Sequence, residues 1–117
     1  MSHDVVARLR SLCLSFPGAV ELQTWGHPTF RVGEKMFAAC GAQPEGVVTM
    51  SCKCTRDLQP AILERPGYFR PAYVGDKGWL GIRLDGTVPW EEVQVHVDRA
   101  WRLTAPKRIS RGYLRGA

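Results

Sequence analysis

Aromatic and cationic side chains occur together between residues 25 and 83, a combination suited to binding nucleic acids. Among the residues in this range are the aromatics Trp25, Tyr68, Phe69, Tyr73 and Trp79 and the cations Arg31, Arg70, Lys77 and Arg83. Aromatic faces stack on bases, and cations neutralise phosphate groups. The same aromatic side chains also suit a small-molecule pocket. Large aromatics dominate small cores, so we expect Phe69 and Tyr73 to be packing residues and Trp79 to belong to a binding surface.

Two short segments of the sequence repeat the same turn pattern. Val32-Gly33-Glu34-Lys35 and Val74-Gly75-Asp76-Lys77 are each followed, two residues after the lysine, by a large aromatic residue. One interpretation is that a common surface turn is used twice. The other is a pair of hairpin wings that grip a partner. Because an acid offsets the lysine at each tip, Arg31, Arg70 and Arg83 would have to add positive charge for phosphate binding.

Histidine and serine positions do not form a recognisable catalytic pattern. His27 follows Trp25-Gly26 and is placed for binding, for a general base, or for a structural role in a Gly-His-Pro turn. His3 is close to the N-terminus, and we expect His96 on the polar face of the last helix. The sequence has no Gly-x-Ser-x-Gly elbow, His-Glu-x-x-His pair or phosphate loop. We therefore expect a protein that is not an enzyme.

Four cysteines, Cys13, Cys40, Cys52 and Cys54, are the remaining candidates for chemistry. Cys52 and Cys54 are the only close pair, and two thiolates without a nearby histidine leave a tetrahedral zinc site half built. Strand alternation explains their spacing equally well. We expect four reduced, mostly buried thiols, with no metal and no cofactor.

The positive charge of the chain is concentrated at its C-terminus. Sixteen Lys and Arg residues against eleven Asp and Glu residues give a net charge of +5. The segment 106–117 contains Lys107, Arg108, Arg111 and Arg115 and no acid. Lys107 and Arg108 either complement the negative end of the last helix or extend a basic patch with this tail. The basic pI alone is weak evidence for a nucleic-acid partner.

Apolar spacing predicts three helices. The first has Val5, Val6, Leu9, Leu12, Cys13 and Phe16 on one face, with Asp4 as its N-cap and Pro17-Gly18 as its end. A short second helix starts near Asp57, ends by Pro66, and turns Leu58, Ile62 and Ala61 inward. The third begins near Pro89, ends before Pro106, and carries the apolar stripe Trp90, Val93, Val97, Ala100 and Trp101.

The segments between these helices read as β-strands. We expect strands at about 20–25, 29–32, 35–40 and 47–53, and a hairpin formed by 67–74 and 77–84. Gly33-Glu34 suits a type II′ turn. Residues predicted to face the core are Phe30, Val32, Phe37, Val48, Met50, Cys52, Cys54, Leu80, Ile82 and Leu84. Residues predicted to face away are Arg31, Met36, Ala38, Thr49, Ser51, Lys53, Trp79 and Arg83.

These elements define an α+β protein of two layers, with helices packed on an antiparallel sheet in the order α-β(3-4)-α-β-β-α. Its 117 residues are enough for one domain with its own core, which we place at 1–105, followed by the basic tail 106–117. The sequence has 44% hydrophobic and 23% charged residues, with no bilayer-spanning apolar run and no secretory signal. We expect a cytoplasmic protein without a membrane partner.

Three stretches of the sequence resemble the MmcQ/YjbR family of small bacterial proteins. They are Trp25-Gly26-His27-Pro28-Thr29-Phe30-Arg31-Val32, Pro66–Val74 together with Lys77-Gly78-Trp79, and Ala105-Pro106-Lys107-Arg108. The resemblance runs from the first helix to Arg108. It implies a CyaY-like α+β fold and DNA binding through a double wing. Frataxin-like iron delivery would need an acidic ridge on the first helix, which carries only Asp4.

The interpretation that joins these observations is a small non-enzymatic protein that binds DNA or another nucleic acid. Its two hairpin wings and a basic, aromatic surface would form the contact. The residues expected at this surface are Trp25, His27, Arg31, Lys35, Tyr68, Arg70, Lys77, Trp79, Arg83, Lys107 and Arg108. The alternative is a protein that sequesters an aromatic small molecule or drug in a pocket lined by Trp25, Tyr68 and Trp79. A domain for protein interaction is a third possibility, and it predicts a broad exposed apolar patch.

Overall fold

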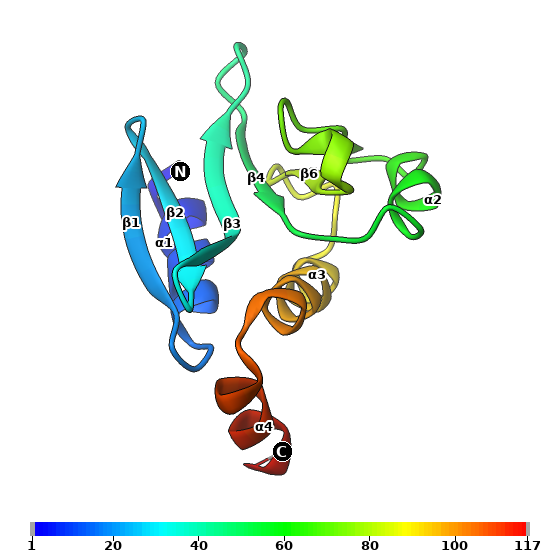
Figure 1. Cartoon of the computed structure of the whole chain (residues 1–117). Helices are drawn as coiled ribbons and strands as arrows, with labels where there is room; N and C mark the ends of the chain where they lie inside the picture. Colours follow the sequence, from blue (N-terminus) through cyan, green and yellow to red (C-terminus); the bar gives the residue numbers. More distant parts are fainter. Residues whose placement is uncertain (1, 117) are drawn as a thin grey trace.

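Six strands and four α-helices make up the fold in the computed structural model (Figure 1). It describes the backbone of residues 2–116 and the side chains of residues 4–112. The helices are α1 (Ser2–Leu14), α2 (Gln59–Leu63), α3 (Trp90–Thr104) and α4 (Lys107–Gly116), and a 3₁₀ turn, η1, covers Gly75–Lys77. The strands are β1 (Val20–Thr24), β2 (His27–Val32), β3 (Lys35–Ala42), β4 (Val48–Cys52), β5 (Tyr68–Phe69) and β6 (Leu80–Arg83).

The strands form one antiparallel sheet in the order β1-β2-β3-β4-β6-β5. The first four are neighbours in both sequence and space, because each is joined to the next by a short turn. β6 pairs with β4, and the two-residue β5 pairs with the outer side of β6. The predicted α+β class with an antiparallel sheet is confirmed.

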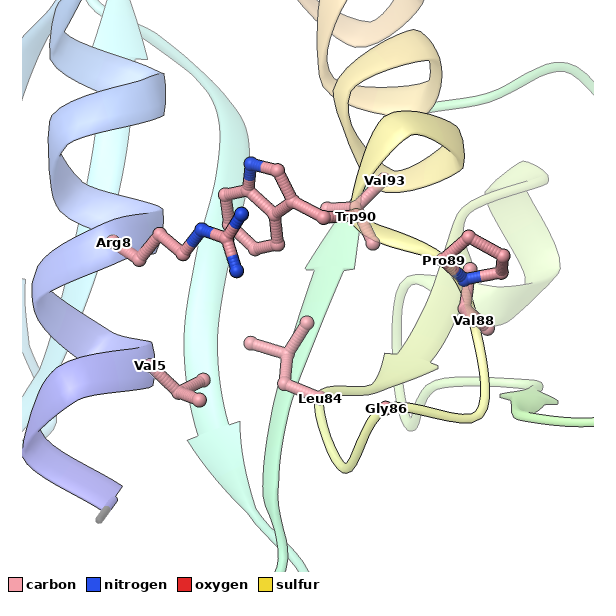
Figure 2. Close-up of a pocket in the computed structure, with 8 residues that line it drawn as sticks. All are labelled: Val5, Arg8, Leu84, Gly86, Val88, Pro89, Trp90 and Val93. Carbon is pink, nitrogen blue, oxygen red and sulfur yellow. The ribbon is translucent and has the colours of Figure 1, made fainter.

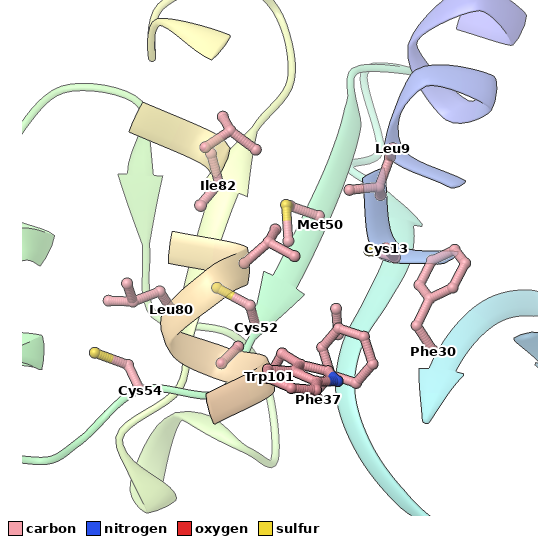
Figure 3. Packing of buried hydrophobic residues seen from close by; sticks show 14 of the residues in the cluster. Leu9, Cys13, Phe30, Phe37, Met50, Cys52, Cys54, Leu80, Ile82 and Trp101 are labelled. Carbon is pink, nitrogen blue, oxygen red and sulfur yellow. The ribbon is translucent and has the colours of Figure 1, made fainter. Parts of the chain in front are cut away.

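One face of the sheet supplies the hydrophobic core. Cross-strand pairing aligns Phe30, Ala38, Cys52 and Leu80 on this face, and α1 and α3 pack against it through Leu9, Cys13, Val97 and Trp101. Figure 3 shows Trp101 of α3 beside Phe37 and Cys52. The predicted core strand residues are all buried or packed against this cluster. The predicted stripe of α3 is confirmed as well, since Val93, Val97, Ala100 and Trp101 are buried.

Two details of the first hairpins differ from the sequence prediction. Gly33 and Glu34 have φ values of 58° and 72°. Positive φ at both central residues makes this a type I′ turn rather than type II′. Ala38 is buried with Phe37, although it was predicted to face away. The physical reason is a β-bulge: Phe30 pairs with Ala38 and Arg31 with Met36, so Phe37 is the extra residue and the alternation shifts.

The second predicted hairpin is confirmed in part: β5 and β6 pair antiparallel, but the tight turn predicted at Gly75-Asp76 is wrong. Its predicted strands shrink to β5 and β6, and residues 70–79 between them form turns and η1. Buried Gln59 explains this conformation, because its side-chain amide donates to the carbonyls of Gly75 and Trp79, both at 2.8 Å. Figure 1 places η1 at the upper right and the β2–β3 turn at the lower end near α4, so the two predicted wings do not form a pair.

Several helix ends and faces also differ from the predictions. α1 starts at Ser2, which puts Asp4 in its first turn instead of at the N-cap. Leu58, rather than Asp57, precedes α2, and its N–H is accepted by the Thr55 hydroxyl at 3.2 Å. Buried Gln59 takes the inward position predicted for Leu58 and Ala61, which are both exposed. None of the helices in residues 2–116 is long and apolar enough to cross a membrane.

The segment predicted as a basic tail forms α4 over Lys107–Gly116. Ile109 packs against the core, and the backbone at Gly33 lies directly against Pro106, which precedes the helix. Lys107 and Arg108 were predicted to lie at the end of the last helix. They belong instead to the first turn of a separate helix, α4. The side chains of His3 and Arg115 lie outside the described residues.

Candidate functional site

The sheet face opposite the core has a floor of short side chains. Strand pairing aligns Thr29 with Ala39, Ala39 with Ser51, and Gly41 with Thr49 on this face. Side chains this small leave a trough along β3 and β4. Its cavity has a volume of about 330 Å³. His27 lines one side, and residues from β5 and the following loop, namely Phe69, Pro71, Ala72 and Val74, line the other.

A glycine allows the Phe69 ring to form the wall of this trough. Gly81 of β6 pairs with Phe69, and a Cβ built on Gly81 would lie only 2.4 Å from the ring atom Cε2. The ring therefore rests directly on the backbone of β6. Gly41 on the floor has more room, because a Cβ at this position would have Thr49 Oγ1 as its nearest atom, 3.4 Å away.

This contrast gives a testable prediction. Gly81→Ala is expected to displace the Phe69 ring and lower the free energy of unfolding by about 1–3 kcal/mol, the usual cost of overpacking. Gly41→Ala is the matched control, and we expect a change below about 1 kcal/mol because its methyl group meets only a hydroxyl at contact distance. Urea denaturation followed by circular dichroism measures both variants. Equal stability of the two variants would contradict this account of the Phe69 wall.

Two almost fully exposed aromatic residues are close in sequence to residues that line the trough. Trp25 is 93% exposed in the β1–β2 turn, two residues before His27. Tyr73 is 96% exposed between Ala72 and Val74. Both have left-handed backbone conformations, with φ values of 55° and 66°. For Trp25 this is hairpin geometry, because Trp25 and Gly26, with φ values of 55° and 79°, are the central residues of a type I′ turn. Tyr73 is a bulky residue in a conformation that such residues rarely adopt. The outcome corrects the prediction that Tyr73 is a packing residue.

Cations accompany the trough on the same face. Arg31 of β2 is cross-strand from Val20 and Met36, and its Nε is buried without a hydrogen-bond partner among the described residues. The alternation of β4, with Cys52 and Cys54 buried in the core, turns Lys53 toward the trough side. Glu21 of β1 points to the other face, where its carboxylate pairs with Arg10 of α1 at 2.6 Å. Arg31 and Lys53 therefore give this face a positive potential.

Other predicted cations are paired or distant. Arg83 reaches the same face but bonds to Gln43, and it forms ion pairs with Asp85 at 3.1 Å and Glu45 at 3.3 Å. Arg70 forms an ion pair with Asp76, and this carboxylate offsets the positive charge that would attract a phosphate. Lys77 is exposed in η1. Three cations, Lys35, Lys107 and Arg108, are exposed at the end of the molecule where the β2–β3 turn meets Pro106.

Trp79 and Tyr68 belong to the interior and not to a binding surface. Trp79 is only 6% exposed, which overturns its assignment to a binding site. Tyr68 is on the core face of β5, where its ring meets His96 of α3 edge to face with centroids 5.3 Å apart. The aromatic pocket predicted from Trp25, Tyr68 and Trp79 is therefore not formed, because two of its members point away from the exposed third.

Tyr68 and His96 are part of a hydrogen-bond chain with a fixed direction. Arg99 has only donors, so His96 Nδ1 accepts from it at 2.9 Å and the ring proton is on Nε2. Nε2–H then donates to the Tyr68 hydroxyl at 2.7 Å, and that hydroxyl donates to Glu92. Arg65 also donates to Glu92, at 2.8 Å. His96 is thus buried, contrary to the predicted exposure on the polar face of α3.

The environment of this chain keeps its members in defined protonation states. Burial, reinforced by Arg99, lowers the pKa of His96 to about 4. Burial and the bond to Glu92 raise the pKa of Tyr68. The Tyr68 hydroxyl and Arg65 lower the pKa of Glu92. At neutral pH the imidazole is therefore neutral, the phenol protonated and the carboxylate charged, which suits a structural link between β5 and α3.

The four cysteines are free and buried, as the sequence predicts. Burial raises the pKa of Cys52 to about 12 and also raises the pKa of Cys13 and of Cys40. Thiols in this state are poor nucleophiles. Within the described part of the chain, no three His, Cys, Asp or Glu side chains are grouped as metal ligands.

The sheet order, α1 and α3 on one face and the trough on the other define a two-layer α+β protein. The chain belongs to the YjbR family, whose sequence profile matches residues 14–103. The first two stretches that resemble this family lie inside the matched range, but the closing motif, residues 105–108, lies beyond it. No curated protein matches the sequence.

Two solved structures are similar to the chain. A Deinococcus radiodurans protein with a DUF419 domain is 24% identical, with a TM-score of 0.74 over 84% of this chain and 76% of that chain. A Pseudomonas syringae protein is 17% identical, with a TM-score of 0.68 over 74% of this chain and 86% of that chain. At these identities the similarity shows a shared fold.

Proposed function

We propose that this protein is a non-enzymatic binding protein that holds single-stranded nucleic acid across the sheet face that carries the trough. The observation that carries the proposal is the almost complete exposure of Trp25 and Tyr73, which are close in sequence to the trough residues His27, Ala72 and Val74. Aromatic side chains on an open sheet are a common platform for stacking unpaired bases. The trough itself is lined by small residues such as Ala39, Gly41 and Ser51.

The charges on this face support the same partner. Arg31 and Lys53 have no carboxylate partner among the described residues, whereas Arg70 and Arg83 are already paired with acids. A phosphate backbone would supply the missing negative charge. Because η1 replaces the tight hairpin tip predicted at Gly75-Asp76, a grip on duplex DNA by two projecting wings loses its basis, and an unpaired strand across the sheet face is the better fit.

The test is fluorescence anisotropy with short labelled single-stranded DNA and RNA and with a duplex of the same sequence. We expect the single strands to bind more tightly than the duplex. Trp25→Ala and Tyr73→Ala should each weaken binding about tenfold or more, since stacking contributes about 1–3 kcal/mol per base. Affinity should also fall steeply between about 50 mM and about 200 mM salt, because counterions are released on binding.

Matched variants separate this surface from nonspecific basicity. Val95→Ala removes an exposed apolar side chain from α3 and should leave the affinity unchanged. A Lys107→Ala/Arg108→Ala double variant removes two positive charges far from the trough and should have a smaller effect than either aromatic substitution. The proposal is contradicted if only that double variant loses binding of the single strand, or if the wild type does not bind it at about 50 mM salt.

A second candidate function is favoured by the trough itself. Its volume of about 330 Å³ falls in the range of small-molecule sites. An aromatic small molecule that stacked on Tyr73 would occupy the Phe69 side of the trough. Affinity that hardly changes with salt, in the same anisotropy series with a fluorescent aromatic ligand, would favour this function over nucleic-acid binding.

A further inference from the structure

A different cavity is enclosed between the start of α1 and the start of α3. Its volume is about 190 Å³. Figure 2 shows Val5 and Arg8 of α1 on one side, Leu84 below, and Val88, Trp90 and Val93 on the other side. These elements are separated in sequence by most of the chain, so the cavity exists only in the folded protein. None of its residues belongs to the sheet trough.

The lining of this cavity is apolar at its inner end. Val88 and Val93 are buried core residues, and Leu84 and Trp90 pack against the same core. At the mouth, Gly86 has no atom near its would-be Cβ, which leaves an opening to solvent. An apolar cavity of about 150 Å³ is known to take up benzene and to stay dry otherwise. The present volume therefore suits an apolar group of about six to eight carbon atoms.

One cation stands at the rim without a counter-ion. The Arg8 guanidinium lies over the Trp90 ring, with Cζ 4.3 Å from the ring centroid. Arg8 is the only charged residue among those that line the cavity, and it forms no ion pair with any described residue. No described residue accepts a hydrogen bond from Arg8, so the N–H groups of its guanidinium are available. These groups match a carboxylate, which accepts two parallel hydrogen bonds from arginine.

We propose that this cavity binds a small apolar carboxylate. The ring or short chain of the ligand fills the space between Val5, Leu84 and Val93, and its carboxylate pairs with Arg8 at the rim. Size selects a group of about six to eight carbons, and Arg8 selects the negative charge. The site does not depend on nucleic-acid binding at the trough, because the two places share no residue.

The experiment is an NMR titration of the full chain that follows the indole N–H resonance of Trp90, which a Trp90→Phe variant identifies. Hexanoate and phenylacetate are the probes. Hexanol and hexylamine are control ligands of similar size to hexanoate that carry a neutral and a positively charged group in place of the carboxylate. We expect the two carboxylates to shift this resonance saturably, and the alcohol to bind about tenfold more weakly or worse, because it lacks the charge-assisted pairing. The amine should not bind.

Two variants and a control make the test specific. Arg8→Gln removes an exposed cation, and we expect it to weaken carboxylate binding about tenfold while leaving hexanol binding unchanged. Val5→Phe fills the cavity from the partly exposed side of α1 and should abolish both, with folding checked by circular dichroism. Arg108→Gln on α4 should retain wild-type affinity. The proposal is overturned by equal binding of hexanoate and hexanol, by full affinity in Arg8→Gln, or by the absence of a saturable shift.

Discussion

Trp101→Ala is expected to lower the free energy of unfolding by about 3–5 kcal/mol, the usual cost of removing a large buried aromatic side chain. Trp101 is fully buried in α3 and stacks on Phe16 with ring centroids 5.6 Å apart. Its Nε1–H also donates to the Pro17 carbonyl at 3.0 Å. The side chain thus joins α3 to the end of the α1 segment, and its loss leaves a cavity at the centre of the core. Urea denaturation followed by circular dichroism measures the change.

Two further variants show whether packing or the hydrogen bond dominates. Trp101→Phe keeps an aromatic ring but leaves the Pro17 carbonyl without its donor, and we expect a loss of about 1–3 kcal/mol. Val95→Ala, on the exposed side of the same helix, should change stability by less than about 0.5 kcal/mol. A cost for Trp101→Ala no greater than that of Val95→Ala would contradict the assigned packing. Should the alanine variant not fold, the phenylalanine variant carries the comparison.

The sheet and core were predictable because they follow from local periodicity. Met50 and Cys52 of β4 and Cys54 just after it alternate along the chain, and a period of two places them on one face. Val93, Val97 and Ala100 follow the helical period in the same way. His96 shares that period with Val93 and Ala100, so the signal for its burial was present in the sequence. The polar character of histidine led to the wrong prediction, and its partner Tyr68 is too distant in sequence to be recognised.

Residues 70–79 were not predictable from local sequence. Two segments of nearly identical sequence differ in structure. Gly33-Glu34-Lys35 contains a two-residue hairpin turn, whereas Gly75-Asp76-Lys77 forms a 3₁₀ turn. The difference comes from Gln59, whose amide holds the carbonyls of Gly75 and Trp79. The amino-acid composition of a turn does not reveal a hydrogen bond from a residue that is far away in sequence.

The candidate site was predicted in part. Trp25, His27 and Arg31 were identified and lie on or beside the trough face. Tyr73 was recognised as aromatic but expected to be packed, since its exposure depends on a left-handed backbone that its residue type disfavours. The floor of the trough was not predicted. Short side chains on a central strand indicate a binding site only when it is known that no helix covers their side of the sheet. Thr49, Ser51 and Gly41 acquire meaning from strand pairing, which sequence reasoning did not resolve.

The second large effect is a loss of stability with acidification that depends on His96. The native state holds this imidazole neutral with a pKa of about 4, whereas in the unfolded chain it titrates near pH 6.5. Below pH 6.5 the unfolded state therefore binds a proton that the native state does not, and the free energy of unfolding falls as the pH falls. The contribution is complete above pH 6.5 and is lost by about pH 4. The lowering of the pKa from 6.5 to about 4 corresponds to about 3 kcal/mol, at about 1.4 kcal/mol per pKa unit.

Urea denaturation at a series of pH values between about 4.5 and about 7 isolates this contribution, because the acids with lowered pKa values, Asp85 and Glu92, titrate mainly below that window. His96→Gln is expected to be less stable at pH 7, since it disturbs the chain from Arg99 to Tyr68, but to lose much less stability on acidification. His27→Gln removes an exposed imidazole that takes no part in this hydrogen-bond chain. We expect it to keep the wild-type dependence of the free energy of unfolding on pH. A His96→Gln profile parallel to the wild type would mean that the Tyr68–His96–Arg99 chain does not hold the imidazole neutral, and that the link between β5 and α3 must be explained by packing alone.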